Sequence, residues 1–550
     1  MSSRSQQILS ASAGILLTVA VAVVYLWRMD NAVGLFKDDA WYLLLAKSLA
    51  TGQGYRLTNF PFDAGIAIYP PAFPWLLSLF YRLLPEFPQN LWLLKSVSMA
   101  ALLITGWMLV FYFIRQRQLP AFFAYGIALA TILSPALVFL ATSTLMSECV
   151  FTCIEVAILI LIPYCEQDKW KTRLQYNVLI TTIALLATAA FLTRSIGITL
   201  IVSIGLFWIL KRSWKPAMIF AIGVVCFYGP WWGYTTIQRQ LAPPTSQAGT
   251  IATSYTNYFL TQETNLPSSY SRLERLSWGI WQNLTVTFGC GIGGVCFPSL
   301  YRPARESGIE IFDMAEYLGL GPEATGKNRG TMGRVPATIV LSLVLSIIGL
   351  IGFIDRLRQD LTVVELYLIA TFAIFLAWPW SPFRFLLPLI PFLLFYLVHG
   401  WRVVVEWVLK TANRPAKEAQ FMPARVFLLC VISLFVYDHI GYLQAKTDPS
   451  AAEGPPPVIQ TFAAAQEVME WVRTHTSETE VLTTNNLPLV HIYSRRKTIT
   501  CALPDCPAQG VRYFVNVAPL TPVPGMIAGK IVFQPAHSSL YVFELSKAEK

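Results

Sequence analysis

Charged residues are scarce in this chain: Asp, Glu, Lys and Arg together make up 13% of its 550 residues. Soluble globular domains carry about 25% charged residues. The hydrophobic set reaches 55%, the mean hydropathy is +0.52, and apolar runs recur from residue 8 to residue 443. This composition excludes a soluble enzyme, a disordered protein and a nucleic-acid-binding domain, and it predicts a polytopic membrane protein.

Several sequence signatures are also missing. The chain contains no dinucleotide-binding fingerprint, and its tail contains no glycine-rich phosphate loop. No internal repeat is visible, which counts against the inverted-repeat transporter folds. Aromatic residues are not interleaved with a basic stripe, so the net charge of +10 does not indicate a nucleic-acid partner.

Long apolar runs predict about eleven transmembrane helices, since a span needs about 20 mainly apolar residues. The first run follows only Arg4 and is interpreted as a signal-anchor. Residues 73–84 are apolar but short, and they predict a juxtamembrane or re-entrant helix. The expected spans lie near residues 8–27, 91–114, 120–141, 148–164, 177–193, 195–210, 216–235, 337–354, 361–379, 383–401 and 424–443.

The basic residues indicate the orientation of these spans. With the N-terminus in the cytoplasm, Lys and Arg collect in the turns after every second span, as the positive-inside rule requires. Those turns contain Arg115, Arg117, Lys169, Lys171, Arg173, Lys211, Arg212, Lys215, Arg356, Arg358, Arg402, Lys410, Arg414, Lys417 and Arg425. This threading predicts a first external loop at 28–90, a large external loop at 236–336 and an extracytoplasmic tail.

The tail changes in character from the rest of the chain. A helical pattern (FAAAQEVMEWVRTH) is followed by strand-like runs (EVLTTN, VRYFVNV, KIVFQPA and SLYVFEL). We therefore expect a transmembrane domain over residues 1–443 and a small extracytoplasmic α/β domain over 444–550.

Two close cysteine pairs lie in the segments expected outside the cytoplasm. Cys290 with Cys296, and Cys501 with Cys506, are candidates for disulfides in an oxidising compartment. Zinc is the competing interpretation, although no nearby histidine completes a ligand set. The other five cysteines fall in or beside apolar segments and suit packing.

Candidate catalytic carboxylates lie at the outer boundary of the membrane. Asp38 and Asp39 follow the first span. Capping of the next helix explains one aspartate, whereas two adjacent carboxylates at a membrane boundary suggest a general base. Glu148 lies at the outer mouth of the fourth span, and Glu155 lies seven residues deeper on the same helical face. Hydrogen bonds to neighbouring Ser and Thr are the structural alternative for these acids.

Two isolated arginines are expected at the same face. Arg194 interrupts the apolar stretch between the fifth and sixth spans, and Arg384 follows WPWSP at the outer end of the tenth. Arginine binds phosphate through a fork of donors, although interfacial snorkelling also explains such positions. Together with the acids, they describe a site for an anionic lipid headgroup.

These motifs resemble the GT-C glycosyltransferases, in particular the bacterial protein-mannosyltransferase-like and aminoarabinose-transferase-like enzymes. The resemblance rests on Asp38-Asp39-Ala-Trp-Tyr with Gly52 and Gly54, on Tyr69-Pro70-Pro71, and on three later motifs. Those are Ser147-Glu148, Thr193-Arg194-Ser195-Ile196-Gly197 and Arg384-Phe385-Leu386-Leu387-Pro388. EVMEWVRTHTSETEVLTTNN and YSRRKT also resemble the outer domain that often ends such chains.

The resemblance implies an all-α polytopic GT-C fold and transfer of a sugar from a polyprenyl phosphate to a glycan, lipid or protein acceptor. It implies Asp38 as the base, with Asp39 and Glu148 positioning the acceptor or a metal. Some relatives have a lysine before the Pro-Pro pair, but here Ile68-Tyr69 stand there. Phosphate binding is therefore expected from Arg194 and Arg384, with Tyr69 beside them.

The sequence leaves alternatives open for the cofactor and for the function. No cofactor is required, but the three carboxylates suit Mg²⁺ or Mn²⁺, whereas zinc lacks a histidine because His399 falls at a cytoplasmic end. A transporter or flippase of a lipid-linked saccharide is the main alternative, and a non-catalytic scaffold is another. The expected location is the plasma (inner) membrane, with the active site extracytoplasmic.

Overall fold

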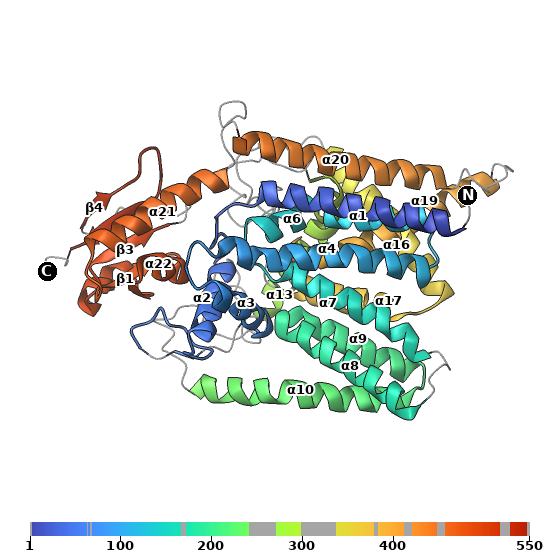
Figure 1. Cartoon of the computed structure of the whole chain (residues 1–550), viewed down its shortest axis with the longest axis horizontal. Coiled ribbons are helices and arrows are strands. Elements are labelled where there is room, and N and C mark those ends of the chain that lie inside the picture. Colours follow the sequence, from blue (N-terminus) through green and yellow to red (C-terminus); the bar gives the residue numbers. More distant parts are fainter. Residues whose placement is uncertain are drawn as a thin grey trace.

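The computed structural model describes residues 3–62, 64–65, 69–166, 172–240, 271–298, 337–378, 383–411, 421–447, 457–517 and 529–546. Long helices run side by side, and a small α/β domain lies at one end of the bundle, shown on the left of Figure 1. We call this the domain end. Helix α1 begins at the opposite end, which we call the basic end (Figure 1).

The helical bundle agrees with the predicted polytopic fold. Within the described residues, seven helices are long and apolar enough to cross a membrane, and α5 with α6 forms an eighth that is bent by 45°. Three shorter apolar helices, Gly14–Arg28, Ser195–Leu210 and Val363–Ala377, occupy the remaining expected positions. The bundle consists of α1 (Ser3–Arg28), α4 (Leu91–Arg115), α5 (Ala121–Ile132), α6 (Pro135–Thr142), α7 (Glu148–Leu161), α8 (Arg173–Thr193), α9 (Ile198–Leu210), α10 (Trp214–Gln240), α16 (Ala337–Gln359), α17 (Val363–Ala377), α19 (Ile390–Thr411) and α20 (Met422–Thr447).

Two short helices of the first loop lie at the domain end. Helix α2 spans Asp38–Ala50, and α3 spans Ala72–Leu83 and packs against it. Helix α3 buries Phe73, Leu77 and Tyr81 on one face, whereas Trp75 and Leu83 remain exposed. Because an amphipathic helix of 12 residues is too short to cross the bilayer, the interfacial interpretation of residues 73–84 fits this geometry.

The described part of the expected large loop is helical. Helix α13 (Arg272–Val286), a π turn (Thr287–Gly291) and α14 (Ile292–Cys296) pack against α16 and α17. The buried Asn283 amide donates hydrogen bonds to the carbonyl oxygens of Phe375 and Trp378, at 2.8 and 2.6 Å. Residues 271–298 are therefore helical and pack against the bundle, and the external location of residues 236–336 stays a prediction. Residues 241–270 and 299–336 of the predicted loop lie outside the described residues.

The C-terminal domain has the expected α/β composition. Strand β1 pairs in parallel with β2 and β3, whereas β3, β5 and β4 pair antiparallel, which gives the order β2-β1-β3-β5-β4. Helix α22 packs on β1 and β2, and α21 packs on α22 and β5. The elements are α21 (Pro457–His475), β1 (Val481–Thr484), α22 (Leu487–Ser494), β2 (Lys497–Ile499), a 3-10 segment (Leu503–Gln509), β3 (Tyr513–Asn516), β4 (Gly529–Phe533) and β5 (Tyr541–Leu545).

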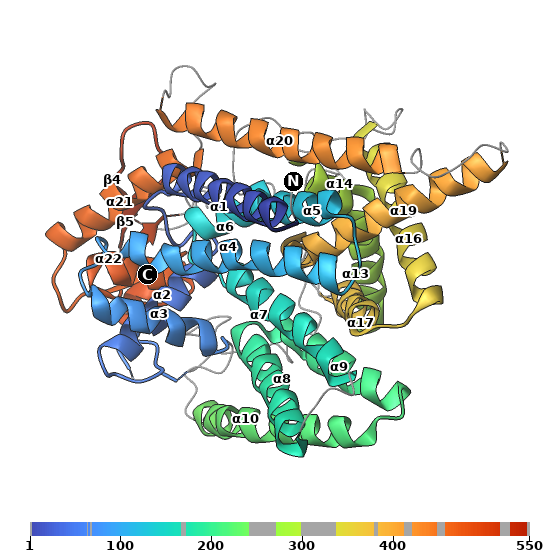
Figure 2. The ribbon, with the colours of Figure 1, turned by 45° about the vertical axis from the view of Figure 1, so that its right-hand side comes forward.

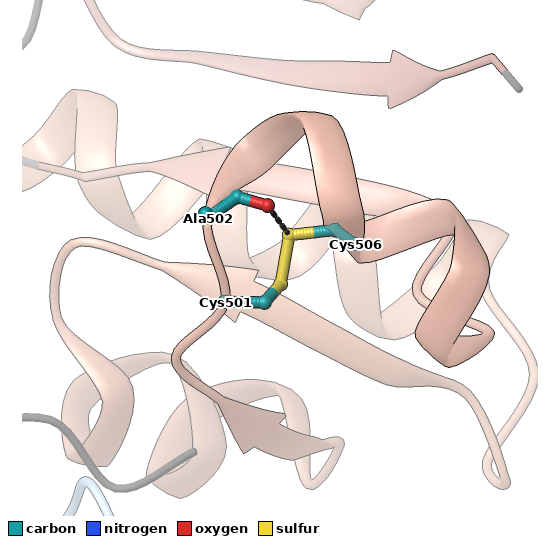
Figure 3. Close-up of a disulfide and its surroundings, with 3 residues drawn as sticks. All are labelled: Cys501, Ala502 and Cys506. Carbon is teal, nitrogen blue, oxygen red and sulfur yellow. Dashed lines mark hydrogen bonds between the residues drawn. A yellow bond between two sulfur atoms is a disulfide. The ribbon is translucent and has the colours of Figure 1, made fainter. Parts of the chain in front are cut away.

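One of the two predicted disulfides is present. Cys501 and Cys506 are bonded, and the Cys506 sulfur lies 3.3 Å from the carbonyl oxygen of Ala502 (Figure 3). Cys296 is instead a buried free thiol, so the expected pair with Cys290 is not formed; the Cys290 side chain itself lies outside the described part of the chain.

We expect Cys501 and Cys506 to resist alkylation in denatured, unreduced membranes and to react only after reduction. Cys296 is the matched control, because a free thiol reacts without reduction once the chain is unfolded. Mass spectrometry of the alkylated peptides provides the measurement. Replacing both partners with serine should lower the stability of the domain by about 2 kcal/mol, as the closed loop is short. Alkylation of both cysteines without reductant would contradict an oxidising location for this domain.

Candidate active site

Four chain segments bring charged side chains together at the domain end. They are the start of α2, the start of α7, the break between α8 and α9, and the short helix α18 (Phe383–Leu386). From these segments the structure brings together Asp38, Glu148, Arg194 and Arg384. We call these four residues the charged cluster.

Asp38 makes one bond through each carboxylate oxygen. The Tyr69 hydroxyl donates to Oδ1 at 2.8 Å, and Nη2 of Arg384 lies 2.8 Å from Oδ2. Lys37 has a positive φ of 60°, and the Asp38 N–H donates to the Phe36 carbonyl at 2.6 Å. Residues 36–38 therefore form a γ-turn directly before the helix. The Asp38 side chain retains 27% of its exposure, so a substrate can reach it.

Glu148 is fully buried and contacts Arg384, the partner of Asp38. Its Oε1 atom lies 2.7 Å from Nη1 of Arg194 and 3.3 Å from Nε of Arg384. As the first residue of α7, Glu148 also lies at the positive end of the helix dipole. Two guanidinium groups and a helix terminus therefore stabilise one buried carboxylate, and Glu148 orients both arginines.

Arg194 occupies the break between two spans because the chain turns sharply there. It ends α8 with extended backbone, and residues Ser195–Gly197 form a 3-10 turn before α9. A Cβ atom at Gly197 would lie 2.6 Å from the backbone nitrogen of Phe191, so only glycine permits this turn. The turn directs the Arg194 side chain to Glu148 and to the Ser147 hydroxyl, which lies 3.3 Å away.

Aromatic rings pack against both guanidinium groups. Arg384 lies 5.7 Å from the centre of the Phe36 ring and 5.9 Å from that of Phe385, and Arg194 lies 5.6 Å from that of Phe385. Arg384 is 23% exposed, whereas Arg194 is 6% exposed. Arg384 is thus the arginine that a substrate can reach.

Asp39 does not join the charged cluster. Its buried carboxylate accepts the backbone N–H groups of Gly34 at 2.7 Å and Phe36 at 3.1 Å. Burial, together with the Asp38 charge, outweighs these hydrogen bonds and raises the pKa of Asp39 to about 6. The geometry therefore gives Asp39 a role in holding the loop at residues 34–36, in place of the expected contact with acceptor or metal.

Because the pKa of Asp39 is raised, its contribution to the free energy of unfolding should decrease as the pH rises from about 4 to 6. The folded state binds this proton more tightly than the unfolded state, so the contribution of Asp39 is greatest at pH 4 and falls by at most about 3 kcal/mol above pH 6. We expect the difference in melting temperature between the wild type and Asp39→Asn, both measured in detergent, to change between pH 4 and pH 6. A pH-independent difference would contradict the raised pKa.

The structure also places Tyr69 at the charged cluster and adds one residue, Tyr42, to which the sequence alone gives no role. The Tyr69 hydroxyl donates to Asp38, and its expected place beside the donor phosphate stays a prediction. Tyr42, one turn after Asp38 on α2, is buried near Ser147, and burial raises its pKa to about 12. Tyr42 had the appearance of an ordinary packing residue in an apolar helix, and only its spacing from Asp38 could have indicated the site. Glu155 is fully buried and lies about 10 Å along α7 from Glu148, outside the cluster.

The described residues fit a divalent cation poorly. No group of three His, Cys, Asp or Glu side chains in the described ranges could hold a metal ion. The Asp38 and Glu148 carboxylates already contact Arg384, and Asp39 faces backbone N–H groups. A cation between Asp38 and Glu148 would have to displace the guanidinium group of Arg384, which already supplies positive charge there, so these residues do not favour a metal.

No family model and no curated protein matches this chain. Its structure resembles that of ArnT from Cupriavidus metallidurans bound to undecaprenyl phosphate, with 12% identity, a TM-score of 0.50 and coverage of 96% of this chain and 97% of that one. It also resembles the Archaeoglobus fulgidus oligosaccharyltransferase, with 12% identity, a TM-score of 0.51 and coverage of 91% of this chain and 69% of that one. The chain therefore has the fold of the GT-C membrane proteins.

Proposed function

We propose that this chain is an integral membrane glycosyltransferase that transfers a sugar from a polyprenyl-phosphate-linked donor to an acceptor hydroxyl. The observation that carries the proposal is the charged cluster, in which a half-buried carboxylate shares an arginine with a buried acid. The fold adds support: one solved neighbour is bound to undecaprenyl phosphate, and another is an oligosaccharyltransferase.

We place the site on the extracytoplasmic face of the plasma (inner) membrane. Helices α4, α9, α16 and α19 all end at the basic end, and each has basic residues in or directly after its last turn (Figure 1). By the positive-inside rule that end faces the cytoplasm, which leaves the charged cluster and the C-terminal domain outside. The residues concerned are Arg115, Arg117, Lys211, Arg212, Arg356, Arg358 and Lys410.

The exposure of the four charged residues divides their roles. Asp38 and Arg384 are partly exposed and meet the substrates, whereas Glu148 and Arg194 are buried and hold Arg384 in place. Arg384 takes the donor phosphate, because a guanidinium fork matches phosphate oxygens and the residue stays charged beside an apolar phase. The lipid tail of the donor lies between the helices.

The reaction needs one proton removed and one bond exchanged. Asp38 accepts the proton of the acceptor hydroxyl, whose oxygen attacks the anomeric carbon while the bond from that carbon to the phosphate oxygen breaks. The leaving polyprenyl phosphate keeps the electron pair, and attack from the opposite face inverts the configuration. The protein mainly positions the substrates and removes one proton, and no nucleotide is required.

The test uses purified protein in liposomes with a radiolabelled polyprenyl-phosphate sugar and a mixture of cell-envelope acceptors. Release of free polyprenyl phosphate, with label on the acceptor, would support the proposal. Movement of intact donor between leaflets without release would instead identify a transporter, for which Glu155 is the intramembrane acid on α7. Absence of both activities would favour the scaffold interpretation.

A further inference from the structure

The C-terminal domain contacts the first loop, which carries Asp38. Helix α22 lies beside α2 in both views of the molecule (Figures 1 and 2). The contact includes one backbone hydrogen bond, from the Thr498 N–H to the Asn59 carbonyl at 2.8 Å. A side-chain bond from Nζ of Lys497 to the Thr58 carbonyl has the same length. The domain is therefore bound to the first loop by several hydrogen bonds and is more than a tethered neighbour.

One chain of hydrogen bonds leads from the domain to the acidic pair. The Asn486 amide donates to the Gly34 carbonyl at 2.8 Å, and the Gly34 N–H donates to Oδ2 of Asp39 at 2.7 Å. The other oxygen of Asp39 accepts the Phe36 N–H. Asp38, directly adjacent, begins α2 through its own bond to the Phe36 carbonyl. The turn that orients Asp38 is thus held by Asp39 from within and by Asn486 from the domain.

Gly34 fits this position because of its backbone and its neighbour. It has φ +85°, a conformation that L side chains rarely adopt, and a Cβ atom there would lie 2.8 Å from Leu489 of α22. The loop therefore bends against α22, which leaves no room for a side chain. Both the carbonyl and the Cα of Gly34 face the C-terminal domain.

The orientation of the Asn486 amide is fixed from its own side. As the N-cap of α22, Asn486 accepts the Leu489 N–H through Oδ1, and its own N–H donates to the Thr484 hydroxyl. With Oδ1 engaged in capping, Nδ2 must face Gly34. Asn486 is buried, so this donor has no competition from bulk water.

We propose that Asn486 is a positioning residue of the active site, through which the C-terminal domain fixes the loop at residues 34–36 and the direction of Asp38. The proposal rests on the proposed function for the role of Asp38, but the loop contact itself does not. Because a displacement of about 1 Å at a reacting group can cost 10²-fold in rate, one hydrogen bond at this turn can control transfer.

The test compares Asn486→Asp with Asn485→Asp. Aspartate at position 486 keeps the helix cap but cannot donate to the Gly34 carbonyl, whereas Asn485 hydrogen-bonds Asn516 and the Val517 N–H inside the domain. We expect Asn486→Asp to lower kcat for transfer by about 10- to 100-fold with donor affinity changed less than about 2-fold, and Asn485→Asp to leave both near wild type. Asn486→Ser, which also caps but adds no charge, should behave like Asn486→Asp.

Hydrogen exchange of the peptide covering residues 33–37 provides a readout that does not depend on activity. We expect its protected amides to exchange at least about 10-fold faster in both Asn486 variants, because the loop loses its outer support. Unchanged exchange, or faster exchange with unchanged kcat, would overturn the proposal. If the wild type transfers no sugar, the proposed function fails by itself, and the exchange result alone then decides whether Asn486 holds the loop.

Discussion

With asparagine in place of Asp38, sugar transfer should fall by about 10³-fold while the donor binds at least as tightly as in the wild type. General bases contribute about 10²- to 10⁴-fold, and an amide cannot accept the proton of the acceptor. Binding survives because Arg384 loses one of its two carboxylate partners, which leaves more of its fork for the donor phosphate. Initial rates of transfer and donor titration on the same preparation measure the two effects separately.

Asp360→Asn is the matched control for this variant. Asp360 is exposed at the basic end, 3.7 Å from Lys211, so the same substitution there should leave transfer unchanged. A wild-type transfer rate in Asp38→Asn would end its assignment as the base. Loss of donor binding in parallel with the rate would instead make Asp38 a binding residue.

Much of the bundle could be predicted, because a run of about 20 apolar residues has few stable alternatives in a membrane. The helices within residues 271–298 could not be predicted from the sequence, because they depend on partners far along the chain. There the Ser342 and Ser346 hydroxyls of α16 donate to the Phe288 carbonyl at the π turn. Helix α22 and strand β2 could not be predicted either, because they have only eight and three residues and their positions depend on the sheet and on the first loop.

The charged cluster was predictable for a related reason. Charged residues at the ends of apolar runs are costly without a partner, so Asp38, Glu148, Arg194 and Arg384 stand out in the sequence. The division of roles between Asp38 and Asp39 was not predictable. It depends on the positive φ of Lys37, which directs one carboxylate to Arg384 and its neighbour to the loop backbone.

The bond between Asp38 and Arg384 couples the two halves of the proposed reaction. Before turnover, the cluster holds two carboxylates and two guanidinium groups, and its formal charge is balanced. When Asp38 accepts the acceptor proton, it no longer competes as an anion for Arg384. At that moment the departing phosphate gains charge, from a diester with one negative charge to a monoester with nearly two. The guanidinium fork is therefore released to the leaving group as its charge develops.

This coupling predicts that Arg384→Gln weakens donor binding by about 10- to 100-fold and lowers kcat by a further 10²- to 10³-fold, since an electrostatic contact that strengthens in the transition state is lost. Arg384→Lys keeps the charge without the fork and should recover donor binding more than kcat. Arg512→Gln, at an exposed pair with Glu544 in the C-terminal domain, is the matched control and should change neither quantity. Donor titration and single-turnover rates provide the measurements. If Arg384→Gln loses donor affinity but keeps its single-turnover rate, Arg384 only binds the phosphate, and charge on the leaving group must be stabilised elsewhere.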